Sequence, residues 1–520
     1  MNKCSRLEKI INYIVKSTFL IIVVMLFLCS ICGNAYVDSK EHTGYCQDNI
    51  LINMLSIIAV ILISTLVVGK HIRVNKKVVI VGIVIWSIAC IVWILMTRLQ
   101  PRADQKYTLD AALQMRAGDF SSLKDGGYLY IHPHQYGLTL YFYTVSFLFN
   151  ENTFLGVQFI NIIALLATFL AMYKTMEIFH NNRNISKCTI LALLAFIPMA
   201  MYITFVYGNI MGLSCSVLAV MFEMYYLKSE RKRYIFAFAS LISISVIFKS
   251  NYLITMVAMI VVLILETIFR RKIKYVIPII AIILCYVLGN YGVKCTMKLI
   301  SNIDSNDGTP NITYVAMGMQ EGNMAPGWYN GYNKKVYVKN DYNSEIAKEK
   351  ALESIRESMN KFKSEPQYTA KFYSEKITSQ WNNPTFQSIW INLGRKSVGV
   401  EKNRIVKSII KERKLGKALI FYMNIIQTII LFGTVGYFII NYTKIGTKEL
   451  IYAIIFIGGF VFHLIWEAKC QYTITYFILL IPYSILGYRA IGEKFVKLYN
   501  LKSKKLKSIG TKDIIKQVEQ

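Results

Sequence analysis

The chain contains the uninterrupted apolar run Val78-Val-Ile-Val-Gly-Ile-Val-Ile-Trp-Ser-Ile-Ala-Cys-Ile-Val-Trp-Ile-Leu-Met96. A helix needs about 20 predominantly apolar residues to cross the hydrocarbon core of a bilayer. This run has that length, and Lys76 and Lys77 precede it on the side where basic residues usually remain in the cytoplasm. Comparable runs recur along the 520 residues, so the sequence predicts an all-α integral membrane bundle.

A polar stretch follows this run, from Arg98 to Tyr141. It holds acids, bases, glycines and two prolines, Pro101 and Pro133, between segments that are otherwise apolar. Because the preceding run leads outward, the polar stretch is expected at the outer mouth of the bundle, where chemistry on a substrate could take place.

Composition excludes several classes of protein. The chain is 54% hydrophobic and 17% charged, which is typical of a polytopic membrane protein. The net charge of +29 does not indicate nucleic-acid binding, because much of the Lys and Arg flanks apolar runs and would face membrane lipid. The ten cysteines are scattered and form neither a disulfide framework nor a zinc pattern.

Length and charge together predict about twelve transmembrane helices, with both termini cytoplasmic in a multi-pass cell-membrane protein. The expected spans are 18–32, 50–68, 78–96, 154–179, 188–206, 210–227, 234–248, 252–268, 275–292, 419–440, 450–466 and 472–486. Gly33-Asn34-Ala35 would also suit cleavage of a signal peptide, but the many later spans favour a retained first helix.

These spans divide the chain into six parts. They are three N-terminal helices (1–96), an external catalytic loop with interfacial helices (97–153), central helices (154–293), a large mixed external domain (294–416), three last helices (417–488) and a basic tail (489–520). Three further helices are expected outside the spans: a short aromatic one over 136–149, an amphipathic one over about 344–363, and one holding Tyr368 to Trp381. Alternating lysines and isoleucines within 402–417 predict an interfacial helix there.

Asp104 is the candidate catalytic residue, at the expected start of a short helix. A carboxylate at that position could accept a proton from a substrate hydroxyl while nearby cations stabilise a leaving phosphate. The alternative is that Asp104 is a solvated loop acid that caps the helix. The spacing alone leaves both interpretations open.

The residues around Asp104 carry a resemblance. Pro101 to Asp104, Gly118-Asp119-Phe120, Gly127-Tyr128-Leu129 and His132-Pro133-His134-Gln135 resemble the first external loop of the multispanning C-type glycosyltransferases, and more narrowly the bacterial dolichyl-phosphate-mannose-protein mannosyltransferase-like group. The resemblance implies a polyprenyl-phosphate-linked sugar as donor and the Asp104 carboxylate as the catalytic base. Many relatives have Asp-Glu where this chain has Asp104-Gln105, and Arg-Tyr where it has Gln471-Tyr472.

The resemblance also implies the remaining site residues. Arg102, Lys249 and Lys469 are candidate contacts of the donor phosphate, and His132, His134, Gln135 and Tyr107 are candidates for shaping the substrate loop. Two histidines around a proline lack a shared helical face, so no histidine-bound metal is expected, whereas a divalent cation such as Mg²⁺ or Mn²⁺ would prefer oxygen ligands and is left open.

The function indicated is a glycosyltransferase on the outer face of a bacterial cytoplasmic membrane, acting on a glycan, lipid or protein acceptor. Two alternatives remain. An envelope-polysaccharide polymerase or ligase would rely on basic residues of the late external loop instead of Asp104. A transporter or lipid flippase would show internal repeats and ionisable residues near the middle of the bilayer.

Overall fold

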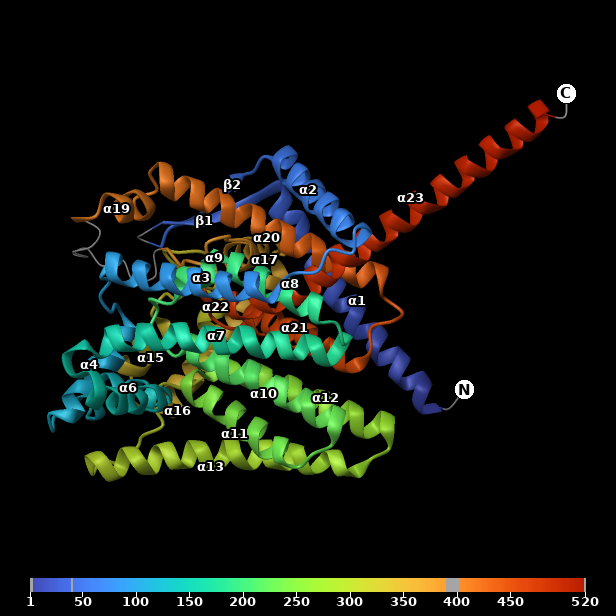
Figure 1. The fold of residues 1–520 in the computed structure, drawn as a ribbon. Helices are drawn as coiled ribbons and strands as arrows, with labels where there is room; N and C mark the ends of the chain where they lie inside the picture. The colour runs from blue at the N-terminus through green and yellow to red at the C-terminus, as the bar shows by residue number, and fades with distance from the viewer. Residues whose placement is uncertain (1–2, 39–40, 390–401, 519–520) are drawn as a thin grey trace.

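The structure, a computed structural model, describes residues 3–38, 41–389 and 402–518. In this part the chain is almost entirely helical, with one two-stranded sheet (Figure 1). Ten helical segments of the described chain are long and apolar enough to cross a membrane, and they indicate a multi-pass membrane protein. They are Arg6–Cys32, Ile50–Gly69, Lys76–Thr97, Pro133–His180, Asn209–Ser229, Ser250–Arg270, Ile273–Ser301, Lys414–Ile440, Thr447–Ile465 and Cys470–Leu501.

Two segments expected as spans form shorter helices. The run 188–206 divides into α8 (Arg183–Ala195) and α9 (Ile197–Tyr202), with Pro198 in the first turn of α9. Proline lacks the N–H that a continuous helix would need at that position. The run 234–248 lies in α11 (Arg233–Phe248), whose 16 residues extend about 24 Å, less than the hydrocarbon core.

The long helices pack as two groups. The first group comprises α7 (Thr153–His180), α10 (Asn209–Ser229), α11 and α13 (Val276–Ser301). The second group comprises α1 (Lys3–Cys32), α2 (Ile50–Gly69), α20 (Lys414–Ile440) and α23 (Ile481–Val518). Contacts among α1, α12 (Leu253–Arg270) and α21 (Ile451–Ile465) join the two groups. The remaining long helix, α3 (Lys76–Thr97), packs on α7 and α8.

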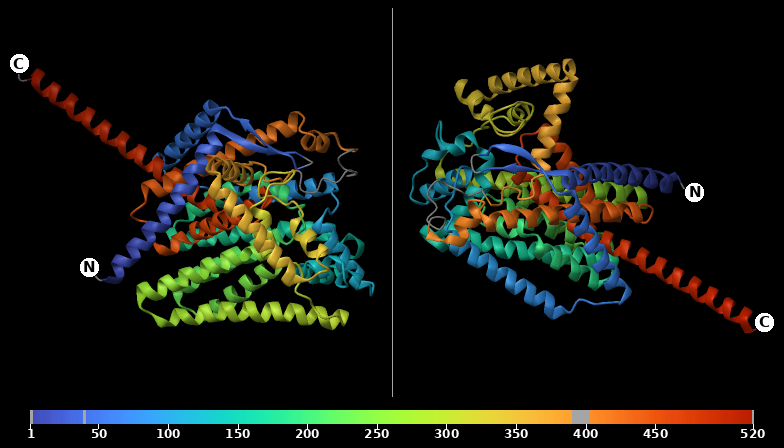
Figure 2. Two further views of the ribbon diagram at one scale, coloured as in Figure 1. Left: turned by 180° about the vertical axis from the view of Figure 1, so that it is seen from behind. Right: turned by 90° about the horizontal axis from the view of Figure 1, so that it is seen from above.

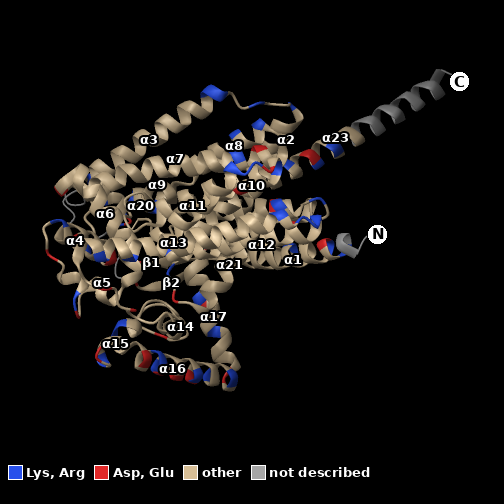
Figure 3. Ribbon diagram, turned by 90° about the horizontal axis from the view of Figure 1, so that it is seen from below, with Lys and Arg blue, Asp and Glu red and all other residues tan. Residues whose placement is uncertain are grey.

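The bundle has two unlike ends. The terminal end carries both chain termini and the short links 70–75, 230–232, 271–272 and 441–446, and Lys and Arg gather there as well as on the outlying α16 (Figure 3). The opposite end, called the cavity end below, carries the polar stretch and the long segment between α13 and α20 (Figures 1 and 2).

Short helices build the polar stretch at the cavity end. They are α4 (Asp104–Arg116), α5 (Tyr128–Ile131) and α6 (Tyr136–Phe149), with 3-10 turns at Ser121–Leu123 and Pro133–Gln135. The helix expected over 136–149 is confirmed with these bounds. It packs against α4, α7 and α13, so its aromatic side chains are partly covered by protein.

The segment before α20 adds α14 (Ile312–Gly318), α15 (Tyr332–Lys339), α16 (Ser344–Ser364), α17 (Pro366–Trp381) and α19 (Arg404–Ile410). The helices expected near 344–363, at Tyr368 to Trp381 and within 402–417 are confirmed. Figures 2 and 3 show α17 projecting from the bundle and holding α16 away from it.

A β-hairpin that the sequence analysis did not predict follows α1. Its strands, β1 (Gly33–Val37) and β2 (Thr43–Gln47), are antiparallel. Asn382 and Asn383, just after α17, donate side-chain hydrogen bonds to the backbone oxygens of Gly33 (2.9 Å) and Ala35 (3.0 Å). The hairpin therefore ties the end of the N-terminal helix to the segment just after α17, 349 residues further along the chain.

Candidate functional site

A cavity of about 440 Å³ opens at the cavity end. Its walls come from the polar stretch, from the links before α10 and before α12, from α13 and the segment after it, and from the link between α21 and α22 (Cys470–Phe477). Asp104, His132, His134, Gln135 and Lys249 line it, so five of the eight residues singled out in the sequence meet in one space.

Asp104 is the first residue of α4 and is exposed. Ala103 before it has φ 51°, a conformation that residues with a Cβ rarely adopt. Ala103 occupies the N-cap position and no side chain caps the helix, so the interpretation of Asp104 as the helix cap does not fit. Strained backbone of this kind is common where a side chain is held for function.

Gln105, the residue after Asp104, positions the start of α4. It is buried, and its Oε1 accepts a hydrogen bond from the backbone N–H of Val206 at 2.8 Å. This bond fixes the start of α4 against the link that carries Tyr207.

A row of hydrogen bonds leads to Asp104. The Nε2 of Gln135 donates to the Tyr207 hydroxyl at 2.7 Å. Tyr207 in turn donates to Tyr128, and Tyr128 donates to Asp104. Burial, and then the charge of Asp104, raise the pKa of both tyrosines well above the usual range, so both hydroxyls remain protonated donors that orient the carboxylate.

Lys249 lies in the link between α11 and α12. Its Nζ is 3.7 Å from the centroid of the Tyr207 ring and 5.7 Å from that of Tyr472. Burial lowers the pKa of Lys249 to about 8, and the charges of Asp104 and Glu467 oppose that shift. The cavity thus holds a cation between two carboxylates and against aromatic faces.

Glu467 is carried by a rigidly held link. Its backbone N–H donates to Tyr314 O at 3.2 Å, and the Nζ of the buried Lys376 donates to the backbone oxygens of Leu464 (2.9 Å) and Trp466 (3.2 Å). Burial raises the pKa of Glu467 to about 7, opposed by Lys469, Lys249 and Lys376. The carboxyl group therefore titrates near neutrality.

The histidines of the polar stretch lie side by side with ring centroids 5.6 Å apart. Burial lowers the pKa of His132 to about 4, so its ring is neutral at neutral pH. Its Nδ1 is 3.5 Å from the Tyr314 hydroxyl. In the described chain no group of three or more His, Cys, Asp or Glu residues could hold a metal ion.

Three residues singled out in the sequence lie outside the cavity lining. Lys469 forms an ion pair of 2.7 Å with Glu41, which follows β1. Tyr107 is exposed and stacks on Tyr128 with centroids 5.2 Å apart. Arg102 is exposed just before α4. Lys469 acts on the cavity through its charge on Glu467, and its Nζ lies 6.0 Å from the ring centroid of Tyr329, which lines the cavity.

The sequence analysis did not select Tyr128, Tyr207 or Glu467 as site residues. One signal for Glu467 was available, since it is the only acidic residue between Glu449 and Glu493 and stands between two apolar runs. The two tyrosines have no such signal among 35 tyrosines.

The fold and this cavity together define a multi-pass membrane protein with a polar site at one end of its bundle. Comparisons with protein-family models, with curated proteins and with solved structures gave no match to this chain.

Proposed function

We propose that this protein is a membrane glycosyltransferase that moves a sugar from a polyprenyl-phosphate donor to an acceptor hydroxyl. The observation that carries the proposal is the meeting of Asp104 and Lys249 in one cavity beside the bilayer. A carboxylate can accept the proton of a hydroxyl, and a lysine can bind a phosphate.

The lining of the cavity supports a lipid-linked donor. Val246 and Ile247 from α11, Leu253 from α12 and Val293 from α13 give one wall an apolar character. Most of the apolar length of α13 is exposed, as expected of a helix that faces lipid. A polyprenyl chain could lie on this wall while its phosphate reaches Lys249.

The proposed reaction is a single displacement. The acceptor hydroxyl gives its proton to the Asp104 carboxylate, and its oxygen forms a bond to the anomeric carbon of the sugar. The bond from that carbon to the phosphate oxygen breaks, and the polyprenyl phosphate leaves with the electron pair. Lys249 stabilises the phosphate charge, and Tyr128 holds Asp104 in place.

The finer parts of the proposal are a cytoplasmic terminal end and an outward-facing cavity in a bacterial cell-membrane enzyme. Twelve spans result if the shorter α8–α9 pair and α11 cross the membrane together with the ten long segments. The basic links of the terminal end support that orientation. The acceptor is a glycan, lipid or protein. A divalent cation such as Mg²⁺ or Mn²⁺ would have to use oxygen ligands of the cavity, among which the carboxylates of Asp104 and Asp307 belong to exposed residues.

The test replaces Asp104 by Asn in membranes that contain labelled polyprenyl-phosphate sugars. Release of the lipid phosphate is expected to fall by about a hundredfold to ten-thousandfold, because the amide accepts no proton, while donor binding is retained. The control is Asp110→Asn on the same helix, whose carboxylate is paired with Lys106 at 2.5 Å.

Unchanged release by Asp104→Asn would remove Asp104 as the base. That result would favour the alternative functions, an envelope-polysaccharide polymerase or ligase, or a transporter or lipid flippase. Loss of release in both aspartate variants would indicate that α4 is unstable to substitution.

A further inference from the structure

Three residues that line the cavity each hold a buried acceptor oxygen without a hydrogen-bond donor from the described chain. The oxygens are Oδ1 of Asn306, Oδ1 of Asn333 and Oε1 of Glu467. Buried oxygens of this kind are nearly always bonded in native proteins, and the exceptions call for an explanation such as a missing ligand.

The two amides cannot easily turn these oxygens away. Asn306 uses its Nδ2 to donate to Tyr130 O at 2.9 Å and faces the Tyr337 hydroxyl at 3.5 Å. Asn333, in the first turn of α15, is only 1% exposed and donates to the Tyr314 hydroxyl. Because each amide nitrogen is engaged elsewhere, a flip that exchanged nitrogen and oxygen would break these hydrogen bonds, and each oxygen keeps its place among the residues that line the cavity.

The third oxygen, Oε1 of Glu467, is equally constrained. Glu467 is 6% exposed, and the residue after it is held on both sides. The Ala468 N–H donates to Gly327 O at 3.2 Å, and Gln380 Nε2 donates to Ala468 O at 3.2 Å. The link cannot swing out to give the carboxyl group another partner.

These acceptors fit a ligand that is rich in donors. They would repel a phosphate, whose oxygens are also acceptors, so the phosphate belongs at Lys249. Hydroxyl groups are donors and suit all three oxygens. Tyr314 and Trp466 add an aromatic wall to the same space, since their rings lie parallel, with an interplanar angle of 4° and centroids 5.7 Å apart.

We propose that Asn306, Asn333 and Glu467 form the sugar subsite of the cavity, in which their three free oxygens accept hydrogen bonds from ring hydroxyls of the transferred sugar. The inference rests on the proposed function and extends it, because it assigns the specificity for the sugar to residues distinct from Asp104 and Lys249. The Tyr314–Trp466 wall contacts the apolar face of the sugar ring.

The test compares two lipids as probes: polyprenyl phosphate alone, and polyprenyl phosphate that carries mannose, glucose or N-acetylglucosamine. The full-length protein in nanodiscs is expected to bind at least one sugar-bearing lipid more tightly than the bare lipid. Glu467→Gln keeps the shape but exchanges acceptor capacity for a donor, and it should reduce this preference by about tenfold. Lys249→Met should weaken the binding of both lipids by the same factor.

Deoxy sugars sharpen the test. A donor that lacks one bonded hydroxyl should bind about tenfold more weakly to the wild type, because an acceptor is left unpaired. In Glu467→Gln, the loss of affinity caused by removing one particular hydroxyl should disappear. In Asn333→Leu, the loss caused by removing a different hydroxyl should disappear. Glu357→Gln, on the exposed face of α16, is the control and should retain every such loss.

The outcomes separate the two proposals. If the protein binds bare polyprenyl phosphate but Glu467→Gln and Asn333→Leu weaken both lipids equally, the sugar subsite is wrong and the proposed function stands. If the protein binds neither lipid, the proposed function fails and the subsite fails with it. A misfolded Asn333→Leu variant still leaves Glu467→Gln, which changes no volume, to decide.

Discussion

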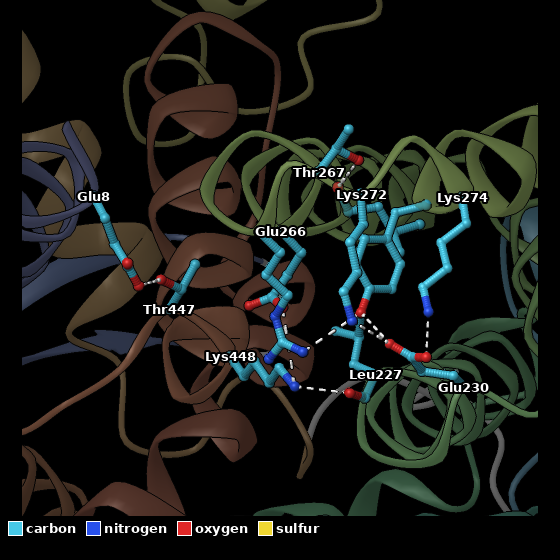
Figure 4. Close-up of polar contacts among 12 residues, drawn as sticks. Glu8, Leu227, Glu230, Glu266, Thr267, Lys272, Lys274, Thr447 and Lys448 are labelled. Carbon is cyan, nitrogen blue, oxygen red and sulfur yellow. Dashed lines mark hydrogen bonds and ion pairs between the residues drawn. The ribbon is translucent and has the colours of Figure 1, made fainter. Parts of the chain in front are cut away.

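The polar side chains at the two ends of the bundle differ in their hydrogen-bond and ion-pair partners. At the terminal end, acids and bases are paired with one another (Figure 4). Glu230 forms ion pairs with Lys272 and Lys274 and accepts from the Tyr275 hydroxyl at 3.0 Å. Glu266 forms an ion pair of 2.5 Å with Arg270. The contacts of Glu230 link the end of α10 to the segment before α13, and the Glu266–Arg270 pair stabilises the last turns of α12.

At the cavity end, Asn306, Asn333 and Glu467 present oxygens without a described donor, and Lys249 lies against aromatic rings. A paired network has already used its capacity for hydrogen bonds in holding helices together. Buried polar groups without partners destabilise the protein while the cavity is empty, and a ligand that bonds to them restores the lost stability. The comparison therefore separates polar groups that serve the fold from those available to a substrate.

Glu223 is an exception that tests this contrast. It lies on α10, is fully buried, and neither carboxyl oxygen has a hydrogen-bond donor in the described chain. If ligand binding is confined to the cavity end, Glu223→Gln should leave turnover and donor affinity unchanged, whereas a transporter would lose activity.

After the loss of turnover expected for Asp104→Asn, the largest effect is expected for Lys249→Met. Donor affinity should fall by about tenfold to a hundredfold, because a charge-assisted contact with the phosphate is removed. Binding of labelled polyprenyl-phosphate sugar to membranes measures it. The matched control, Lys274→Met, removes a paired lysine of the terminal end and should leave affinity intact. Equal losses of donor affinity in Lys249→Met and Lys274→Met would contradict the difference between the two ends of the bundle.

The pH dependence of donor binding follows from the same lysine. Below about pH 8 Lys249 is protonated and attracts phosphate, and above it the charge is lost. Affinity should therefore fall as pH rises from 7 to 9.5, approaching tenfold per pH unit at the upper end. Glu467 becomes negative above about pH 7 and adds an earlier, shallower decline. Glu467→Gln should remove that early part, and a flat profile in the wild type would refute the assignment.

A smaller effect is expected when the row of hydrogen bonds to Asp104 is interrupted. Tyr207→Phe removes the hydroxyl that bridges Gln135 and Tyr128 but keeps the ring beneath Lys249. Turnover should fall by about tenfold with donor affinity unchanged. Tyr141→Phe is the control, since that buried hydroxyl has no partner in the described chain. A change in affinity instead of turnover would show that Tyr207 acts through Lys249.

The smallest functional effect is expected at the terminal end. Glu230→Gln weakens the ion pairs with Lys272 and Lys274, so thermal unfolding should begin at a lower temperature while turnover per folded molecule stays at the wild-type level. A turnover defect that persists after correction for folded protein would mean that the two ends are coupled.

Much of this organisation is readable in the sequence. Apolar length and basic flanks give the helical membrane bundle, and aromatic or amphipathic spacing gives α6 and α16 with nearly their observed bounds. The β-hairpin was missed because each strand has only five residues, and Gly33 and Gly44 interrupt the short run of strand-forming residues. The break at Phe196 was missed because hydropathy takes no account of the backbone bond that Pro198 removes.

The site could be predicted only in part. Asp104, Lys249 and the histidines stand out by type and position, but the importance of Asn306 and Asn333 lies in what they fail to contact, which depends on the packing of distant segments. Lys469 shows the reverse case. The sequence makes it a plausible phosphate ligand, yet the hairpin brings Glu41 to it and pairs the charge.

The span of sequence that builds the cavity has a consequence for how the protein is made. Its walls extend from Asp104 to Tyr472, so a ribosome must synthesise nearly the whole chain before they can meet. During most of translation the Asp104 loop stands without the Glu467 link that faces it. A nascent chain that stops before α22 would already contain most of its membrane helices but no closed cavity, so prematurely terminated products should insert into the membrane without acquiring partial activity.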